Sequence, residues 1–191
     1  MNLHNLIVPI MHNAVDRVMA AMLGIQVGAA NASVEQGAPE STEEVVAFIG
    51  IAGTWAGTGS LSCSAVLACH LCGLMLTTES PAVNEEVLDA VGELTNMIVG
   101  NVKTDLERHV GPLCLSSPTA IIGRNFKTKG ARNTRWTVLR YEIDGETLTL
   151  KLCLTPQDTC CHTQVCGVTH GGQDRRGLPS HETALGKEFP P

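Results

Sequence analysis

Residues 85–104 read EEVLDAVGELTNMIVGNVKT, and this stretch predicts the longest helix of the chain. Asn84 is a good N-cap in front of it, and the two glutamates that follow place negative charge in the first turn, where the helix dipole favours it. Its apolar residues recur at helical spacing and form one stripe for a core: Val87, Ala90, Val91, Leu94, Ile98 and Val102. The pattern ends at about Leu106, ahead of the helix-breaking pair Gly111-Pro112.

The other face of this helix carries the polar residues that are suited to chemistry. Glu93 and Asn96 are three residues apart, so their side chains project about 60° apart onto one face. Gly92 and Gly100 stand four residues before and four after Asn96, although each glycine costs about 1 kcal/mol relative to alanine inside a helix. We expect the glycines to clear side chains from around Asn96, so that a partner's backbone approaches its amide. The alternative is a solvated face with two glycines packed under a strand.

The N-terminal part of the chain predicts a helix followed by a strand. Apolar residues at steps of three and four predict an amphipathic helix over Leu6–Leu23, ended by Gly24. The next five residues, Ile25–Ala29, are a plausible strand. The polar stretch Asn31–Thr42 contains Gly37 and Pro39, and so is expected to be a loop.

The middle of the chain predicts a hairpin and a second helix. Val45–Ala52 and Thr58–Cys63 have the composition of two strands, with the glycine-rich segment Gly53–Gly57 as the bend between them. Ser64–Leu76 is almost wholly apolar and rich in alanine and leucine, and its length favours a buried helix. Thr77–Val83 contains a proline and is expected to be a loop.

The segments after the long helix predict more strands. Thr119–Ile122 is a short strand, and Trp136–Ile143 and Thr147–Leu154 flank Asp144-Gly145, the usual chemistry of a type I′ hairpin turn. The resulting fold class is α+β, with helices packed on an antiparallel sheet. A helix followed by a hairpin occurs twice, which hints at an internal duplication.

The change of composition near residue 155 predicts one domain and a tail. Residues 1–155 carry the periodic apolar pattern, whereas residues 156–191 are rich in Pro, Gly, His, Cys and charged residues, and we expect a disordered tail there.

Composition and charge exclude several classes of protein. The chain has 191 residues with 43% hydrophobic content, which is enough for a core, and a formal net charge of −6, which argues against nucleic acid as a partner. The N-terminus lacks the basic start and cleavage site of a signal peptide, and we expect no apolar run to approach the ~20 residues of a membrane span. We therefore expect a cytoplasmic protein without membrane insertion.

The cysteines offer weaker alternatives. Cys63, Cys69 and Cys72 lie in an apolar stretch, where thiols act as small hydrophobic groups. Cys69-His70-Leu71-Cys72 has the Cys-x-x-Cys spacing of zinc and redox sites, but it lacks a second pair and lies inside an apolar helix. The tail cluster of Cys160, Cys161, His162, Cys166 and His170 matches no common metal finger. No residue is assigned to a metal.

The stretch around Glu93 resembles the signature of the CheX branch of the CheC/CheX/FliY phosphatases. That signature is a Glu-x-x-Asn pair on a long helix followed by Gly-Asn, and the matching positions here are Glu93, Asn96 and Gly100-Asn101. The glycine-containing hairpin over residues 49–60 and the segment Ser117–Gly123 also look like the family's. The resemblance covers roughly residues 6–154, and the tail has no counterpart.

The resemblance implies both a fold and an activity. The fold is a pseudo-duplicated arrangement of helices on an extended antiparallel sheet, often dimeric through sheet edges. The substrate is a phosphorylated CheY-like receiver protein in chemotaxis or a related two-component pathway. The amide of Asn96 would orient a water for in-line attack on the aspartyl phosphate, and Glu93 would contact the receiver's lysine. The receiver itself would supply Mg²⁺, so the chain needs no cofactor of its own.

This chemistry is physically reasonable. An acyl phosphate is already activated, so holding a water in line supplies much of what catalysis requires. An amide suits the task because it both donates and accepts hydrogen bonds without changing charge.

Two further expectations follow from comparing this chain with the family pattern. CheC-type relatives carry a Glu-x-x-Asn pair in both halves, but the best matching position of the first helix here is Val18-Met19-Ala20-Ala21, so we expect a single site. The main alternative function is a non-catalytic domain that docks a receiver or a flagellar-switch component without hydrolysis.

Overall fold

The computed structural model describes residues 3–36, 40–41, 44–78, 80–123, 126–127 and 134–157. The predicted tail therefore lies outside the described residues, apart from its first two positions. The Cys/His cluster of the tail lies outside them as well.

A single antiparallel sheet of seven strands forms the base of the described fold. Its long central strands make two hairpins, and shorter strands lie at both edges, in the order β1-β8-β9-β4-β3-β5, with β6 also paired to β3. The bounds are β1 Asn31–Gln36, β3 Val45–Gly53, β4 Trp55–Cys63, β5 Leu113–Leu115, β6 Thr119–Ile122, β8 Arg135–Ile143 and β9 Glu146–Pro156. Two short strands, β2 Glu40–Ser41 and β7 Phe126–Lys127, pair with each other.

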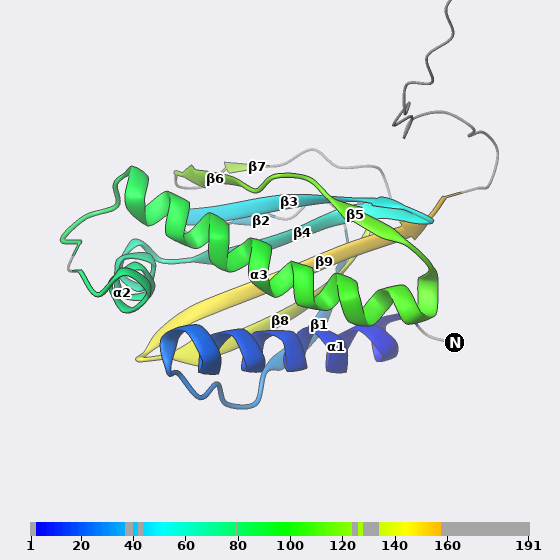
Figure 1. The fold of residues 1–191 in the computed structure, drawn as a ribbon, viewed down its shortest axis with the longest axis horizontal. Coiled ribbons are helices and arrows are strands. Elements are labelled where there is room, and N and C mark those ends of the chain that lie inside the picture. The colour runs from blue at the N-terminus through cyan, green and yellow to red at the C-terminus, as the bar shows by residue number, and fades with distance from the viewer. Residues whose placement is uncertain are drawn as a thin grey trace, which may run out of the picture. The chain divides into compact units, whose positions relative to one another are not determined.

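Three helices lie on one face of this sheet, as Figure 1 shows. α1 spans Leu3–Val18 and continues as a π-helical turn, η1 Met19–Leu23, which ends at Gly24 with a φ of 68°. α2 spans Ala65–Leu76 and α3 spans Glu85–Val110. α1 and α3 lie side by side, and α2 packs at one end of α3. The predicted α+β class, with helices on an antiparallel sheet, is confirmed.

The sheet order shows the internal duplication that the sequence only hinted at. Each half consists of a helix, an edge strand segment and a hairpin: α1, β1 and β3–β4 in the first half, and α3, β5–β6 and β8–β9 in the second. The two hairpins meet at the β4–β9 pair in the centre. Each half's edge strand pairs with the hairpin of the other half, since β1 lies beside β8 and β5–β6 lie beside β3. α1 and α3 are therefore equivalent positions in the two halves.

Both hairpin turns lie where the sequence placed them. Asp144 and Gly145 have φ values of 51° and 81°, which the predicted type I′ turn requires at both central positions. The first bend is tighter than predicted, because β3 runs to Gly53 and β4 already begins at Trp55.

The predictions for Ile25–Ala29 and for the first part of the expected loop, Asn31–Gln36, were wrong. The stretch Ile25–Ala29 contains no strand, and the strand β1 lies instead in the predicted loop, over Asn31–Gln36. β1 is an edge strand whose side chains are mostly exposed, so it carries polar residues and lacks the apolar alternation that marks a strand. The short strand β5 was missed as well, because three residues are too few to show a pattern.

α2 is also less buried than predicted. Ser64 caps it by accepting a hydrogen bond from the backbone N–H of Leu67 at its side-chain Oγ. Its sheet-facing side is buried, but Val66, Leu74 and Leu76 on its outer side are exposed. α2 covers only the end of the sheet, so nothing among the described residues covers its outer face.

The prediction that no apolar run is long enough for a membrane span was also wrong. Leu3–Leu23 is 21 residues long, and an 18-residue stretch within it has a mean hydropathy of 1.3, which meets the length and composition of a span. In the fold, this segment packs its apolar side into the same core as α3 and the sheet. Its length and hydropathy are those of a core helix that covers half of the sheet.

The depth at which α3 packs on the sheet is set by a glycine in β4. A Cβ atom at Gly59 would lie only 2.9 Å from Cγ2 of Val99, which is buried on α3 three residues after Asn96. It would also lie 3.3 Å from Cγ2 of Ile49 on the neighbouring strand. Gly59 therefore allows α3 to lie close to the sheet directly beneath the predicted site.

Replacing Gly59 with alanine is expected to lower the free energy of unfolding by about 1–3 kcal/mol, because the new methyl group overpacks this contact. Urea denaturation measures the change. Gly28→Ala is the matched control, since nothing lies within 4 Å of a Cβ at Gly28. Equal stability of the two variants would show that α3 moves away from the sheet without cost.

Candidate functional site

Glu93 and Asn96 lie on the solvent-facing side of α3, and the opposite side of the same helical turns packs into the core. Leu94, Thr95 and Ile98 are buried on the opposite side, and the Thr95 hydroxyl donates to the carbonyl of Val91 at 2.7 Å. Glu93 is exposed and Asn96 is half-buried. The predicted pair therefore shares an accessible face of a helix whose other side is fixed in the core.

The two glycines that flank Asn96 have different surroundings. Nothing lies within 4 Å of a Cβ atom built at Gly100, whereas a Cβ at Gly92 would contact Pro118 at 3.7 and 3.8 Å. Gly92 is thus buried beneath the segment that joins β5 and β6, and the prediction that both glycines bare the surface was wrong for it. Helical side chains lean towards the N-terminus, so the missing side chain at Gly100 leaves the space beside Asn96 open.

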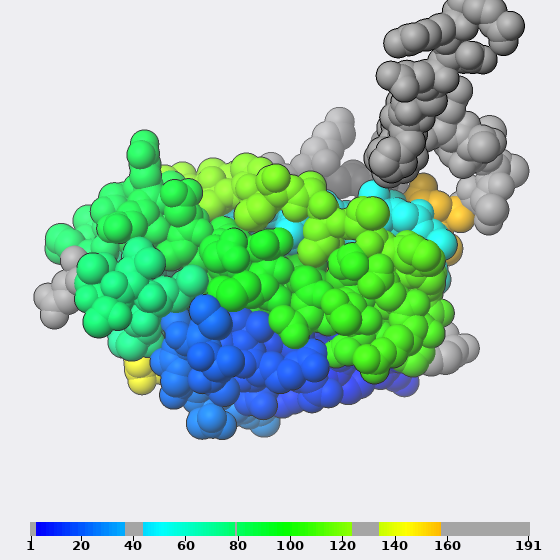
Figure 2. All heavy atoms as spheres, in the orientation of Figure 1, coloured from blue at the N-terminus to red at the C-terminus, as the bar shows by residue number. Residues whose placement is uncertain are grey.

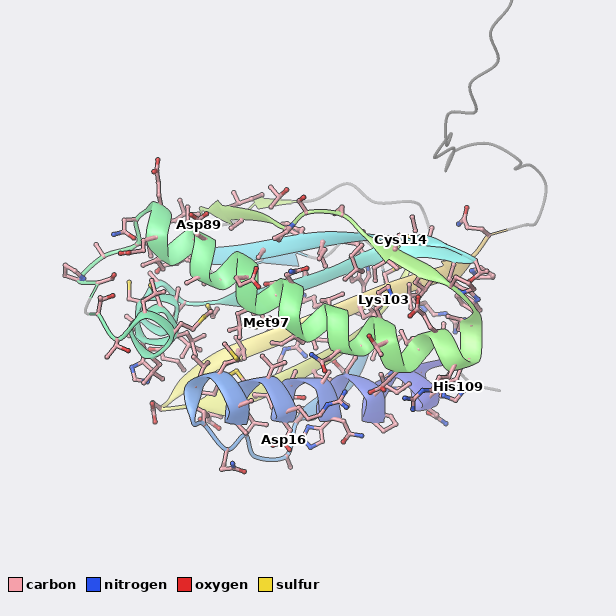
Figure 3. The ribbon with its side chains drawn as sticks, viewed as in Figure 1. Asp16, Asp89, Met97, Lys103, His109 and Cys114 are labelled. Carbon is pink, nitrogen blue, oxygen red and sulfur yellow. The ribbon has the colours of Figure 1, made fainter. Side chains whose placement is uncertain are left out.

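A hollow of about 310 Å³ opens beside Asn96 on the flank of α3 that faces α1. We call it the Asn96 hollow. Figure 3 shows Met97, one of its lining residues, on the side of α3 towards α1. The lining comes from four turns of α3 and one residue of α1: Asn96, Met97, Gly100, Asn101, Thr104, Asp105, Arg108 and Arg17. Figure 2 shows this outward flank of α3 between α1 and the β5–β6 segment.

Asn96 differs from the other small polar residues of the hollow in its hydrogen bonding. The Asn101 amide donates to the carbonyl of Met97 at 2.9 Å, and the Thr104 hydroxyl donates to the carbonyl of Gly100 at 3.0 Å. Within the described part of the chain, the Asn96 side chain has no hydrogen bond, and the Glu93 side chain has neither a hydrogen bond nor an ion pair. The donor and acceptor groups of the Asn96 amide are therefore available to a partner.

The C-terminal end of α3 is fixed by Glu107. Its carboxylate accepts a hydrogen bond from the backbone N–H of Leu113 at 2.9 Å and forms an ion pair with Lys103 at 2.9 Å. The Leu113 N–H and, after it, Lys103 lower the pKa of the Glu107 carboxyl below its ordinary value. Lys103 shares the solvent face with Asn96, but its charge is already paired.

The structure brings Arg17 to the site, which no motif or spacing in the sequence predicted. Arg17 lies on α1, and its Nη2 donates to Oδ2 of Asp105 on α3 at 2.7 Å. The two residues are 88 positions apart in the chain, so only the packing of α1 against α3 makes them neighbours. Asn101 and Thr104 belong to the predicted helix but were not predicted as site residues, and Arg108 lies beyond the predicted end at about Leu106, because α3 runs on to Val110.

The donor groups for a metal site are not gathered at this face. Among the residues that the structure describes, no three His, Cys, Asp or Glu side chains are close enough to hold a metal ion. The supply of Mg²⁺ by the receiver stays a prediction.

The Cys-x-x-Cys pair of α2 has the surroundings of core thiols. Cys72 is fully buried, and Cys69 is half-buried at the surface of α2. Burial, followed by the neighbouring Cys72, raises the pKa of the Cys69 thiol. A raised pKa disfavours the thiolate that metal binding and redox chemistry use.

The equivalent position on α1 carries no comparable polar pair. Val18 and Met19 are buried in the core, and the two alanines that follow have no functional group. The first half of the duplicated fold thus contributes a helix of the same placement without a Glu-x-x-Asn pair.

Comparison with solved structures shows which class of protein has this fold. The chemotaxis protein CheX from Vibrio vulnificus superposes with a TM-score of 0.69 at 20% identity, over 78% of this chain and 99% of that one. The CheX chain in a CheX-CheY-BeF3-Mg²⁺ complex from Borrelia burgdorferi superposes with a TM-score of 0.62 at 19% identity, over 77% and 96%. The middle domain of FliM from H. pylori gives 0.59 at 14% identity, over 77% and 86%. The fold is that of the CheC-like proteins.

The sequence itself assigns the family. Residues 45–140, which include Glu93 and Asn96, match the family described as chemotaxis phosphatase CheX, and the chain belongs to this family. Comparison with curated proteins finds no match.

Proposed function

We propose that this protein is a phosphatase that removes the phosphoryl group from the aspartate of a CheY-type receiver domain. The observation that carries the proposal is Asn96, an amide without a hydrogen bond in the described residues, beside the bare surface of Gly100. Membership of the CheX family supports the activity, and the Borrelia complex of a CheX protein with CheY supports the kind of partner. We expect both proteins to meet in the cytoplasm.

Asn96 acts by positioning a water molecule. The open side at Gly100 admits the loops that surround a receiver's phosphoaspartate, so that the amide reaches the phosphoryl group. One amide hydrogen bond to the water and one to the phosphoryl oxygens place the water in line with the bond that breaks. Positioning of this kind lowers the barrier without an ionisable base. The packing of Leu94 and Ile98 beneath Asn96 keeps the amide in place.

Glu93 fixes the pose of the receiver. It is exposed, three residues before Asn96 on the same face, where its carboxylate contacts a lysine of the receiver's active site. The Mg²⁺ ion belongs to the receiver, and when bound there it neutralises charge on the phosphoryl oxygens.

The direct test is to follow phosphate loss from phosphorylated receivers. Each CheY-type receiver of the same cell is phosphorylated with acetyl phosphate in Mg²⁺, and phosphate release is measured with and without the protein. We expect the protein to accelerate release from at least one receiver at sub-stoichiometric amounts.

The alternative is a scaffold that binds a receiver without hydrolysis. The likeness to the FliM middle domain supports it at the level of the fold. A protein that binds one of these receivers but accelerates phosphate loss from none would be such a scaffold.

Replacing Glu93 with alanine is expected to lower kcat/KM about tenfold, with part of the loss in affinity and part in kcat, because one contact sets both affinity and pose. Steady-state kinetics measure the effect. The half-buried Glu146 at the start of β9 provides the matched control, Glu146→Ala, which removes an equal charge beside the β8–β9 turn. Equal losses in both variants would show that net charge alone is responsible.

We further propose that the protein is a homodimer joined through the edges of its sheet. β1 ends one side of the described sheet, and β5 and β6 end the other. Unpaired edges of this kind readily add a strand from a second copy. Light scattering at tens of micromolar should give the mass of a dimer, and a monomer mass would contradict the proposal.

A further inference from the structure

Arg17 is held over the Asn96 hollow with most of its donors unused. Its side chain is 52% exposed, and Nη2 donates to Oδ2 of Asp105 at 2.7 Å. A guanidinium group has five N–H donors in a planar fork, so one such bond orients the group and leaves the others for a second carboxylate.

Arg108 adds a second positive charge at the same end of the hollow. It is exposed and has no ion pair within the described residues. The lining of the Asn96 hollow contains one acidic residue, Asp105, and two arginines. Lys103 and Glu107 are not among its lining residues, and their charges pair with each other. The hollow therefore has a local positive charge on a chain whose net charge is −6.

Each arginine also has a simpler structural explanation. Arg108 lies in the last turn of α3, where a positive charge interacts favourably with the helix dipole. The ion pair of Arg17 with Asp105 links α1 to α3. An exposed ion pair contributes at most about 1 kcal/mol to stability. Neither explanation requires both arginines to line the hollow that begins at Asn96.

The distance of the two arginines from Asn96 along α3 determines which anions of a partner they can contact. Asp105, and with it the Arg17 guanidinium, lies nine residues beyond Asn96, or about 13 Å along the helix axis, and Arg108 lies about 18 Å beyond it. A phosphoryl group at Asn96 does not reach that far. The anions at this end must therefore be carboxylates on the surface of the partner.

We infer that Arg17 and Arg108 form a second docking point, which binds acidic side chains of the receiver about 13–18 Å from its phosphoaspartate and selects among receivers. This inference rests on the proposed function. Charge complementarity supports it: on a chain with a net charge of −6, the two arginines make this end of the hollow locally positive, and a locally positive patch attracts a partner surface that carries carboxylates.

The test uses variants of the full chain in which an arginine is replaced by the uncharged glutamine. Arg17→Gln, Arg108→Gln and the double variant are assayed with a CheY-type receiver phosphorylated by acetyl phosphate, and their Kd is measured for the same receiver activated with beryllofluoride. We expect KM and Kd to rise about threefold in each single variant and about tenfold in the double variant, with kcat retained. The salt dependence of Kd between about 50 and about 300 mM should also flatten in the double variant.

Two controls separate docking from structure and from overall charge. Arg135→Gln removes the same charge from the exposed start of β8 and should leave KM near its original value. Asp105→Asn breaks the same ion pair but keeps the cation, so it should raise KM less than Arg17→Gln does.

The outcomes are distinct for the two proposals. A double variant with KM and Kd within about twofold of the original, or an Asp105→Asn variant that matches the loss in Arg17→Gln, overturns the docking point. An original protein without phosphatase activity overturns the proposed function instead, and the Kd values for the beryllofluoride-activated receiver still decide the docking point.

Discussion

Replacing Asn96 with alanine is expected to lower kcat about a hundredfold or more while the Kd for an activated receiver changes little. The water then loses the group that orients it, but Glu93 and the surface around Gly100 still meet the receiver. The Asn96 side chain has no hydrogen bond in the described residues, so its replacement breaks no side-chain hydrogen bond there. Single-turnover phosphate release and binding to a beryllofluoride-activated receiver measure the two quantities separately.

Asn13→Ala is the matched control, because Asn13 is an exposed asparagine in the middle of α1. Both substitutions replace asparagine with a better helix former, so thermal stability should stay equal or rise slightly in each. Only the Asn96 variant should lose activity. Near-normal phosphate release by Asn96→Ala would show that another group orients the water.

α3 was predictable from sequence because every local signal agrees along it. Asn84 accepts a hydrogen bond from the backbone N–H of Val87, as its N-cap position predicts. Every residue of the predicted apolar stripe is buried. The helix ends at Val110, just before the predicted break, so that the placement of Glu93 and Asn96 on its outer face followed from helical geometry alone.

The edge strands were not predictable because their partners are distant in sequence. β1 pairs with β8 across about 100 residues, from Asn31 opposite Arg140 to Gln36 opposite Arg135. An edge strand with exposed side chains carries few apolar residues, so local composition favoured a loop there. The same reason explains why Pro118 over Gly92 was unforeseen, since that contact depends on the path of the chain between β5 and β6.

The duplicated fold relates the two sides of the site. α1 and α3 hold equivalent positions, but only α3 carries a Glu-x-x-Asn pair. α1 instead supplies Arg17 to the hollow beside Asn96. On the docking inference, the half without a catalytic pair has become part of the binding surface of the other half.

Substituting Gly100 is expected to make the protein more stable and less active. Gly100 has no positive φ, and nothing lies within 4 Å of a Cβ there, so Gly100→Ala should raise the free energy of unfolding by about 1 kcal/mol, or the melting temperature by about 3 °C. The added methyl group occupies the space through which the receiver reaches Asn96. We expect kcat/KM to fall about tenfold for Gly100→Ala and about a hundredfold for Gly100→Leu, because overpacking grows with side-chain size.

Gly92→Ala separates the two effects, because its methyl group would make ordinary contacts with Pro118, 3.7 and 3.8 Å away, and would stay out of the interface. It should gain a similar stability, measured by thermal unfolding, and keep its activity. If Gly92→Ala lost as much activity as Gly100→Ala, stiffening of α3 would explain both losses. If Gly100→Leu remained active, the receiver would have to approach Asn96 from the side of Glu93, and the bare surface at Gly100 would have no part in docking. Graded loss at Gly100 alone is the result that ties the missing side chain to the approach of the partner.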